Sequence, residues 1–233
     1  MTISRLKLFH YPMTRSARVK WVLHELLGDD FDVETVDLYG GAQYQPEFLG
    51  LNPNHGVPVL EISWSDGTTQ HLIESASMVA FLADAWPEKS LAPPPGATRE
   101  RADYLQMLHF GSTWMDMMLW QIRSHEHLLP EDQRDPRTIE RYRSKFTTEI
   151  EPQLVARLER SGFICGDTFS AADCVIGHSV FWARGYRLCR GDMFKGYIRR
   201  LSERPAFQSA FADARQFQAV PPADGAIVGR FTG

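Results

Sequence analysis

The sequence predicts an α/β amino-terminal domain followed by an all-helical domain, and three observations support this fold class. Period-2 strand patterns alternate with helical spacing as far as residue 86, a proline-rich break follows at residues 86–100, and every later segment has helical spacing. Three consecutive prolines and a glycine cannot continue a helix, so the break is a linker. We therefore expect domains at residues 1–87 and 98–215, a linker at 88–97, and an irregular Gly/Pro-rich extension at 216–233.

The first domain has the predicted order β-α-β followed by β-β-α. The segment "RLKLFH" places its leucines on one strand face, and "ARVKWVLHELL" has helical spacing. "DVETVDL" is a second strand, while "VPVLEI" and "TTQHLI" flank an Asp-Gly pair that predicts a hairpin. The helix after Ser75 completes the domain. A βαβ start implies a parallel pair with a right-handed crossover, and the hairpin adds antiparallel strands to the same sheet.

The second domain is expected to be helical throughout. One helix should run from about 98 to 129, and a second should contain Pro152 as a bend. "SAADCVIGHSVFWA" opens with Ser170 and Asp173 at the spacing of a capping box. Shorter helices are predicted from 193 and 205.

Composition narrows the classes of function. Apolar content of 43% and charged content of 23% are typical of a globular protein, and the net charge of −4 gives no basic face. Nucleic acid and anionic membranes are therefore not expected as partners. No apolar signal region or membrane-length run is present. Three cysteines without a C-x-x-C pattern, Cys165, Cys174 and Cys189, suggest reduced thiols in a cytoplasmic compartment.

"GVPVL" places Pro58 at a strand entrance, and two interpretations are open. An ordinary strand-start proline is one, and the base rate of cis bonds favours it. The other is a cis Val57–Pro58 bond, which would direct the Val57 N–H and C=O toward a ligand backbone.

Glu74 and Ser75 stand where a strand ends and a helix begins, and they also have two interpretations. Ser75 can be an N-cap, with Glu74 complementing the helix dipole. Alternatively, the helix N-terminus with Ser75 binds a ligand carboxylate, and Glu74 pairs with a ligand ammonium. A group that needs both is an α-amino acid.

"YPMTRSARV" carries three hydroxyl groups, on Tyr11, Thr14 and Ser16, between the first strand and the first helix. They can serve turn and cap chemistry, or one can donate a hydrogen bond to an anionic sulfur at the helix N-terminus. The eight histidines show no zinc-ligand spacing, so no metal is expected.

The order of these signals closely resembles the cytosolic glutathione transferases, over about residues 5–214. The matching segments are "NPNHGVPVLE", "LIESASMVAFLADAWP", "FSAADCVIG" and "RLSERPAFQSAFADA". The resemblance implies a thioredoxin-like βαβ-ββα domain, an all-α helical bundle, a homodimer, a cytoplasmic location and a role in detoxification.

The resemblance also assigns residues for binding glutathione. Pro58 would be the family's cis-proline, with the Val57 backbone holding the cysteinyl part, and Glu74 and Ser75 would hold the γ-glutamyl ammonium and carboxylate. Gln43 and His55 are candidates for the glycine carboxylate.

The activating hydroxyl falls on Thr14, which matches the serine of the theta-like and many bacterial classes when Arg18 is aligned with their arginine. Thr replaces Ser here, and Ser16 and Tyr11 are the alternatives. No cysteine lies near Thr14, so the thiol must come from glutathione as cosubstrate.

The electrophile would lie against the helices after the linker, with a site formed by His109, Trp114, Met115 and Met118. The expected reaction is thiolate addition to, or substitution on, an apolar electrophile. Glutathione-dependent peroxidase or isomerase chemistry, or a non-catalytic binding module, remain as alternatives. A thioredoxin-like redox protein is disfavoured because the site lacks a cysteine.

Overall fold

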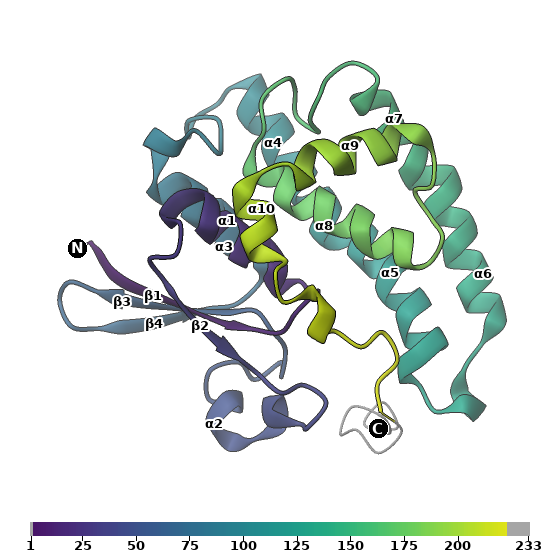
Figure 1. Cartoon of the computed structure of the whole chain (residues 1–233), viewed down its shortest axis with the longest axis horizontal. Helices are drawn as coiled ribbons and strands as arrows, with labels where there is room; N and C mark the ends of the chain where they lie inside the picture. The colour runs from purple at the N-terminus through teal and green to yellow at the C-terminus, as the bar shows by residue number, and fades with distance from the viewer. Residues whose placement is uncertain (1, 223–233) are drawn as a thin grey trace.

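The computed structural model describes residues 2–222, in which a sheet domain and a helical region pack side by side (Figure 1). The sheet has the strand order β2-β1-β3-β4. Its strands are β1 (Ile3–His10), β2 (Asp32–Thr35), β3 (Val59–Trp64) and β4 (Thr69–Leu72). β2 runs parallel to β1, whereas β1–β3 and β3–β4 are antiparallel. The predicted βαβ start and hairpin are both confirmed.

Helices cover both faces of this sheet. In Figure 1, α1 (Ser16–Leu27) and α3 (Ser75–Ala85) lie above it, and the short α2 (Pro46–Leu49) lies below it. Leu8 of β1 is fully buried in the core with α1 and α3. Phe9 points to the opposite face, where its ring meets that of Phe48 at 6.2 Å. This alternation is the period-2 pattern of the sequence.

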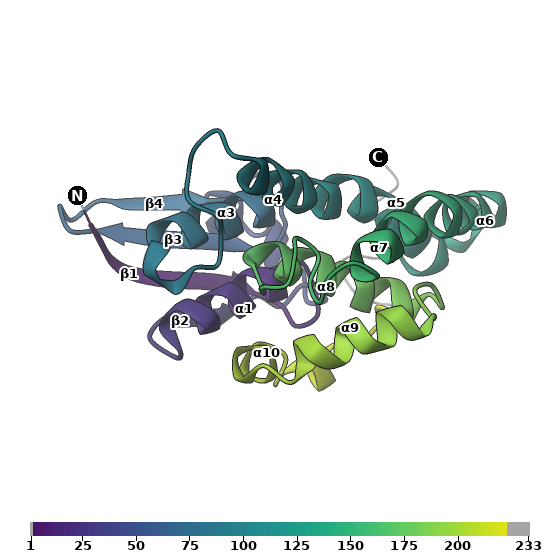
Figure 2. The same ribbon diagram turned by 90° about the horizontal axis from the view of Figure 1, so that it is seen from above.

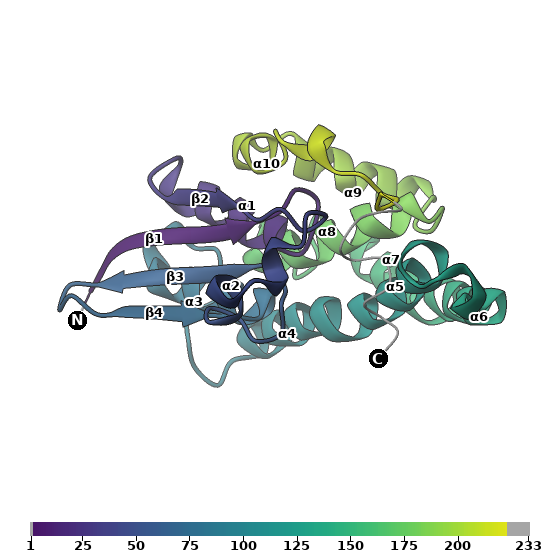
Figure 3. The ribbon, with the colours of Figure 1, turned by 90° about the horizontal axis from the view of Figure 1, so that it is seen from below.

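The carboxy-terminal part is helical, as Figures 2 and 3 show from opposite sides. Its helices are α4 (Arg99–His109), α5 (Asp116–Arg123), α6 (Pro136–Lys145), α7 (Glu151–Leu158), α8 (Ala171–Gly185), α9 (Asp192–Ser202) and α10 (Pro205–Ala210). The central helix, α8, is buried along most of its length. It opens with the predicted capping box, in which the Ser170 and Asp173 side chains each bond the other's backbone.

Between residues 99 and 158, three wide π-helical turns interrupt the long helices. Residues Phe110–Met115 join α4 to α5, Ser124–Leu128 follow α5, and Phe146–Ile150 join α6 to α7. Pro152 lies in the first turn of α7, directly after the third of these. Across the first of these turns the buried side chains of Tyr104, Leu108, Met115, Leu119 and Ile122 stay on one stripe, so the opposite side of α5 is left to face the site.

Ion pairs and aromatic contacts hold the two parts together. Arg101 of α4 donates two hydrogen bonds of 2.8 Å to Asp84 of α3. Trp21 of α1 is fully buried, and its ring lies 5.0 Å from that of Phe207 and 5.6 Å from that of Phe169. Residues that belong to different parts can therefore form a fixed site where the parts meet.

Candidate active site

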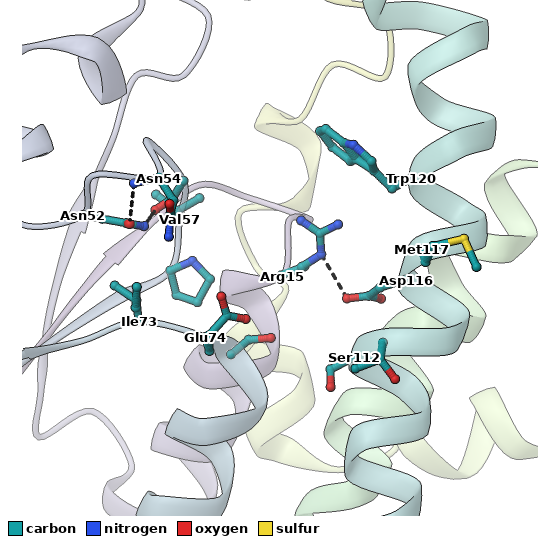
Figure 4. A pocket seen from close by; sticks show the side chains of 14 residues that line it. Arg15, Asn52, Asn54, Val57, Ile73, Glu74, Ser112, Asp116, Met117 and Trp120 are labelled. Carbon is teal, nitrogen blue, oxygen red and sulfur yellow. Dashed lines mark hydrogen bonds and ion pairs between the residues drawn. The ribbon is translucent and has the colours of Figure 1, made fainter.

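Two adjoining cavities lie between the end of the sheet and the helical region. The first, of about 390 Å³, is formed by the start of α3, the loop before β3 and the α5 region (Figure 4). The second, of about 340 Å³, extends toward α8 and the 217–219 segment. Both are lined by Arg15, Gly56, Val57 and Trp120, so the two cavities share a wall.

The Val57–Pro58 peptide bond at this shared wall is cis, as the resemblance implies. Val57 lies outside the β3 ladder, which begins at Val59. Its backbone groups are therefore placed beside the cavity and not within the sheet. The loop is held by Asn52, whose side-chain amide donates to Gly56 O at 2.7 Å.

Glu74 and Ser75 stand at the corner of the first cavity, with a correction to the cap expected from sequence. Ser75 is not an N-cap: it is the first residue of α3, Glu74 occupies the cap position, and no side chain caps the helix. The first N–H groups of α3 are thus left without a capping side chain, and such groups bind anions. Glu74 itself has a φ of +74° and makes no ion pair among residues 2–222. Its side chain is exposed at the start of α3 (Figure 4).

Beneath this corner lies a buried ion-pair network. Arg18 is fully buried and donates to both oxygens of Asp116, at 2.8 and 2.6 Å. Burial alone would raise the pKa of Asp116, but Arg18 and Arg15 outweigh it and lower that pKa. Arg18 also donates to Ser75 Oγ at 3.3 Å, which leaves the Ser75 proton available for a ligand.

His178 completes the network as a neutral side chain. Burial, together with the adjacent Arg18, lowers the pKa of His178 to about 3. Its Nδ1 accepts from Arg18 Nε at 3.1 Å, so Nε2 carries the proton and donates to Met13 O at 3.3 Å. The histidine therefore fixes the turn that carries Thr14.

Of the three hydroxyl candidates, only Thr14 lines either cavity, and it faces the second. Its Oγ1 donates to Tyr11 O at 2.8 Å and lies 2.8 Å from Ser16 Oγ. Ser16 is fully buried, and its Oγ lies 2.7 Å from His10 Nδ1. Burial, with help from Tyr39 and Asp37, raises the pKa of Tyr11 to about 12.

Gln43 and His55 both line the second cavity, next to Val57. Gln43 is 2% exposed; its amide donates to Leu38 O at 2.9 Å, and its Oε1 has no partner among residues 2–222. His55 is exposed, and its ring lies 5.1 Å from that of Tyr44.

The four side chains expected at the electrophile site line neither cavity. Met115 and Met118 are fully buried in the core, and His109 and Trp114 are exposed elsewhere. Met115 and Met118 continue the buried stripe of Tyr104 and Leu108, which faces the core. The opposite face meets the cavities, with Asp116, Met117, Trp120 and Arg123.

Arg15 is the main residue that the sequence reasoning missed. Its Nε donates to Asp116 Oδ2 at 2.9 Å, and its guanidinium lies 5.2 Å from the Trp120 ring centre and 5.4 Å from that of Trp182. A signal was present in the sequence: a cation at a helix N-terminus opposes the helix dipole. Such a departure indicates a functional position.

The remaining candidates for chemistry lie away from these cavities. The three cysteines are unpaired and line neither one, and burial raises the pKa of each thiol. Within residues 2–222, no cluster of His, Cys, Asp and Glu is placed to hold a metal ion. None of the helices described in that range is long and apolar enough to cross a membrane.

Comparisons with known proteins agree with this fold. Residues 4–84 match the family model "Glutathione S-transferase, N-terminal domain". The disulfide-bond oxidoreductase YfcG of Escherichia coli is 32% identical over 193 residues, which are 80% of this chain and 85% of that protein. A Burkholderia graminis glutathione transferase, solved with two glutathione molecules per subunit, superposes with a TM-score of 0.78 at 25% identity, covering 91% and 90% of the two chains. A Methylococcus capsulatus glutathione transferase gives 0.70 at 30% identity, covering 91% and 100%.

Proposed function

The chain belongs to the cytosolic glutathione transferase family, and we propose that Thr14 helps it ionise the thiol of glutathione for attack on small electrophiles. One observation carries the proposal. Glu74 and Ser75, which suit an α-amino acid, lie on one side of the cis Val57–Pro58 bond, and the Thr14 hydroxyl faces the second cavity on the other side.

Glutathione would lie along this wall. The γ-glutamyl carboxylate would bind the first N–H groups of α3 and the Ser75 hydroxyl, while the ammonium pairs with Glu74. The Val57 backbone would hold the cysteinyl residue, which directs the sulfur toward the second cavity. Gln43 and His55 stand on that side for the glycyl end.

Activation of the thiol follows from the groups around the shared wall. A free thiol has a pKa near 8.5, so only a few per cent is thiolate at pH 7. A hydrogen bond from Thr14 and the positive charge of Arg15 both favour the thiolate over the thiol. The thiol gives its proton to solvent, and the thiolate forms a carbon–sulfur bond with the electrophile. In a substitution, the leaving group departs with the electron pair of its bond.

Calorimetry with glutathione, followed by turnover of chlorodinitrobenzene, tests this function. We expect saturable binding that is weakened about tenfold or more by Glu74→Gln, because the ligand ammonium loses a charged partner. Absence of binding at millimolar glutathione would instead identify a non-catalytic module. A homodimer, a cytoplasmic location and a role in detoxification, which the resemblance implies, stay predictions.

Disulfide reduction is a second candidate, favoured by the second cavity and by two relatives. YfcG is named as a disulfide-bond oxidoreductase, and the Burkholderia graminis structure holds two glutathione molecules. The first glutathione thiolate would attack the substrate disulfide and release one thiol. A second glutathione would then attack the glutathionyl sulfur, giving oxidised glutathione and the second thiol. Coupling hydroxyethyl disulfide turnover to glutathione reductase and NADPH measures this reaction directly.

A further inference from the structure

The second cavity differs from the first in the charges that line it. Two carboxylates, Glu74 and Asp116, line the first cavity. Among residues 2–222, no carboxylate lines the second. Arg15, which pairs with Asp116, lines both cavities, whereas Arg123 lines the second alone. Resting on the proposed function, we infer that the second cavity takes a flat aromatic electrophile that carries an anionic group, and that Arg123 binds its charge.

Aromatic rings form much of the wall of this cavity. They come from α5, α8 and the segments beside them: Tyr44, Trp120, Phe181, Trp182, Tyr186 and Phe217. Figure 4 shows Trp120 projecting from α5 toward Arg15. Large ring faces at a binding site favour a planar apolar body through stacking and area burial. This arrangement specifies the aromatic part of the acceptor.

Arg123 is a half-buried guanidinium without a carboxylate partner in the described chain. It lies three residues after Trp120, so the two side chains share one face of α5. Its Nη1 donates to Ala219 O at 3.0 Å, and its guanidinium lies 5.4 Å from the centre of the Phe217 ring. By contrast, Arg15, Arg18, Arg101, Arg143, Arg157 and Arg204 all pair with carboxylates.

The phenols of Tyr39 and Tyr186 accept hydrogen bonds from Arg123, but neither supplies a negative charge. Burial raises the pKa of both Tyr39 and Tyr186, and the nearby guanidinium only partly offsets this, so both phenols stay neutral at pH 7. Burial also lowers the pKa of His127, which is therefore neutral as well. A guanidinium has five N–H donors in a planar fork that matches a carboxylate. An anionic group on the electrophile would supply the negative charge that the neighbours of Arg123 lack.

Two electrophiles that differ by one carboxylate test the inference. Chlorodinitrobenzene and chlorodinitrobenzoate react alike: the glutathione sulfur bonds to the ring carbon that holds chlorine, and chloride leaves with the electron pair of the broken bond. We expect a higher kcat/KM for the benzoate in the wild type. Arg123→Met should lower kcat/KM for the benzoate about 10- to 100-fold and that for the neutral compound less than about threefold. Arg123→Lys, which keeps the charge, should restore part of the preference.

A matched control separates the role of the Arg123 charge from the effect of removing any positive charge from the protein. Arg99→Met removes the same charge from an exposed position outside both cavities and should leave the ratio of the two substrates unchanged. Arg123 also holds the 217–219 segment through Ala219 O, and a purely structural role would lower both activities equally. An unchanged ratio in Arg123→Met would overturn the inference while leaving the transferase function intact. Failure of both substrates in the wild type would instead remove the proposed function.

Oxidised glutathione tests whether the anion that Arg123 binds belongs to a second glutathione and not to an aromatic electrophile. It is anionic but not aromatic, and it competes for the same cavity if the anion belongs to a second glutathione. Calorimetry of the wild type and Arg123→Met measures its binding. Weaker binding of oxidised glutathione by the variant, with an unchanged benzoate ratio, would overturn the aromatic assignment. Unchanged binding with a lost benzoate preference would support it.

Discussion

Replacing Thr14 with valine removes one hydroxyl and keeps the shape of the side chain, so it tests the activating group directly. A hydrogen bond to a charged sulfur contributes about 1.5–3 kcal/mol. Thr14 must first release Tyr11 O, which lies 2.8 Å away, and that neutral bond contributes about 0.5–1.5 kcal/mol. The central values of the two ranges differ by roughly 1–1.5 kcal/mol, or about one pKa unit, because one unit corresponds to about 1.36 kcal/mol.

The pKa of the bound thiol should therefore rise by about one unit in Thr14→Val. With glutathione saturating, the acid limb of the kcat/KM profile for the electrophile should move to higher pH with it. Ultraviolet absorbance of the thiolate, titrated in the glutathione complex, measures the shift. The fold should survive, because Tyr11 O still accepts from Ser16 Oγ at 3.0 Å.

Thr113→Val is a matched control. Thr113 lines the first cavity, and its hydroxyl likewise donates to a backbone oxygen, that of His109, at 2.7 Å. Its loss should leave the thiol pKa unchanged. If Thr14→Val also leaves that pKa unchanged, the reasoning about Thr14 is refuted. A rise in Arg15→Met would then identify the guanidinium as the group that stabilises the thiolate.

Three further predictions concern stability. Glu74→Gly should weaken glutathione binding at least tenfold, as measured by calorimetry. It should keep or raise the melting temperature, because an L-residue at φ +74° carries about 1–3 kcal/mol of strain that glycine relieves. A large drop in melting temperature would contradict this second expectation. Asp116→Asn should lower the free energy of unfolding by about 3–5 kcal/mol in denaturant titrations, because Arg18 stays buried without a carboxylate; a loss below about 1 kcal/mol would count against this. Burial would raise the pKa of Asp213, but hydrogen bonds from His10 and Lys20 lower it to about 2 from 3.8. The contribution of Asp213 to folding stability is thus present above about pH 4 and lost as the pH falls toward 2. Asp213→Asn should flatten the dependence of the unfolding free energy on pH in that window.

The sequence predicted the order of elements because each element carries its own periodicity. The strand alternation around Leu8 and the capping box at Ser170 are local patterns, and the structure has both. Helical spacing does not say which partner a face meets. Met115 and Met118 follow such a stripe, which packs into the core, whereas the residues between them face the cavity.

Only those site residues that form a local sequence motif could be predicted from the sequence. Glu74 and Ser75 mark the helix start by themselves, although the strained φ that makes Glu74 the cap residue has no sequence signal. Local statistics favour a trans bond before Pro58, and only the family resemblance implied the cis bond that is found. The Arg18–Asp116 pair joins residues 98 positions apart, and no pattern in one sequence reveals such a contact.

The opposite charges of the two cavities give each reactant its own place. In the second cavity, the ammonium of glutathione would lie beside Arg123, and in the first, an anionic acceptor would lie beside Glu74, which makes no ion pair in the described chain. Coulomb repulsion in a partly buried site disfavours both exchanged arrangements. The thiol and the acceptor would then meet at the shared wall of Arg15, Val57 and Trp120. Since binding alone sets this orientation, the proximity contribution to the rate comes from the same charges that sort the ligands.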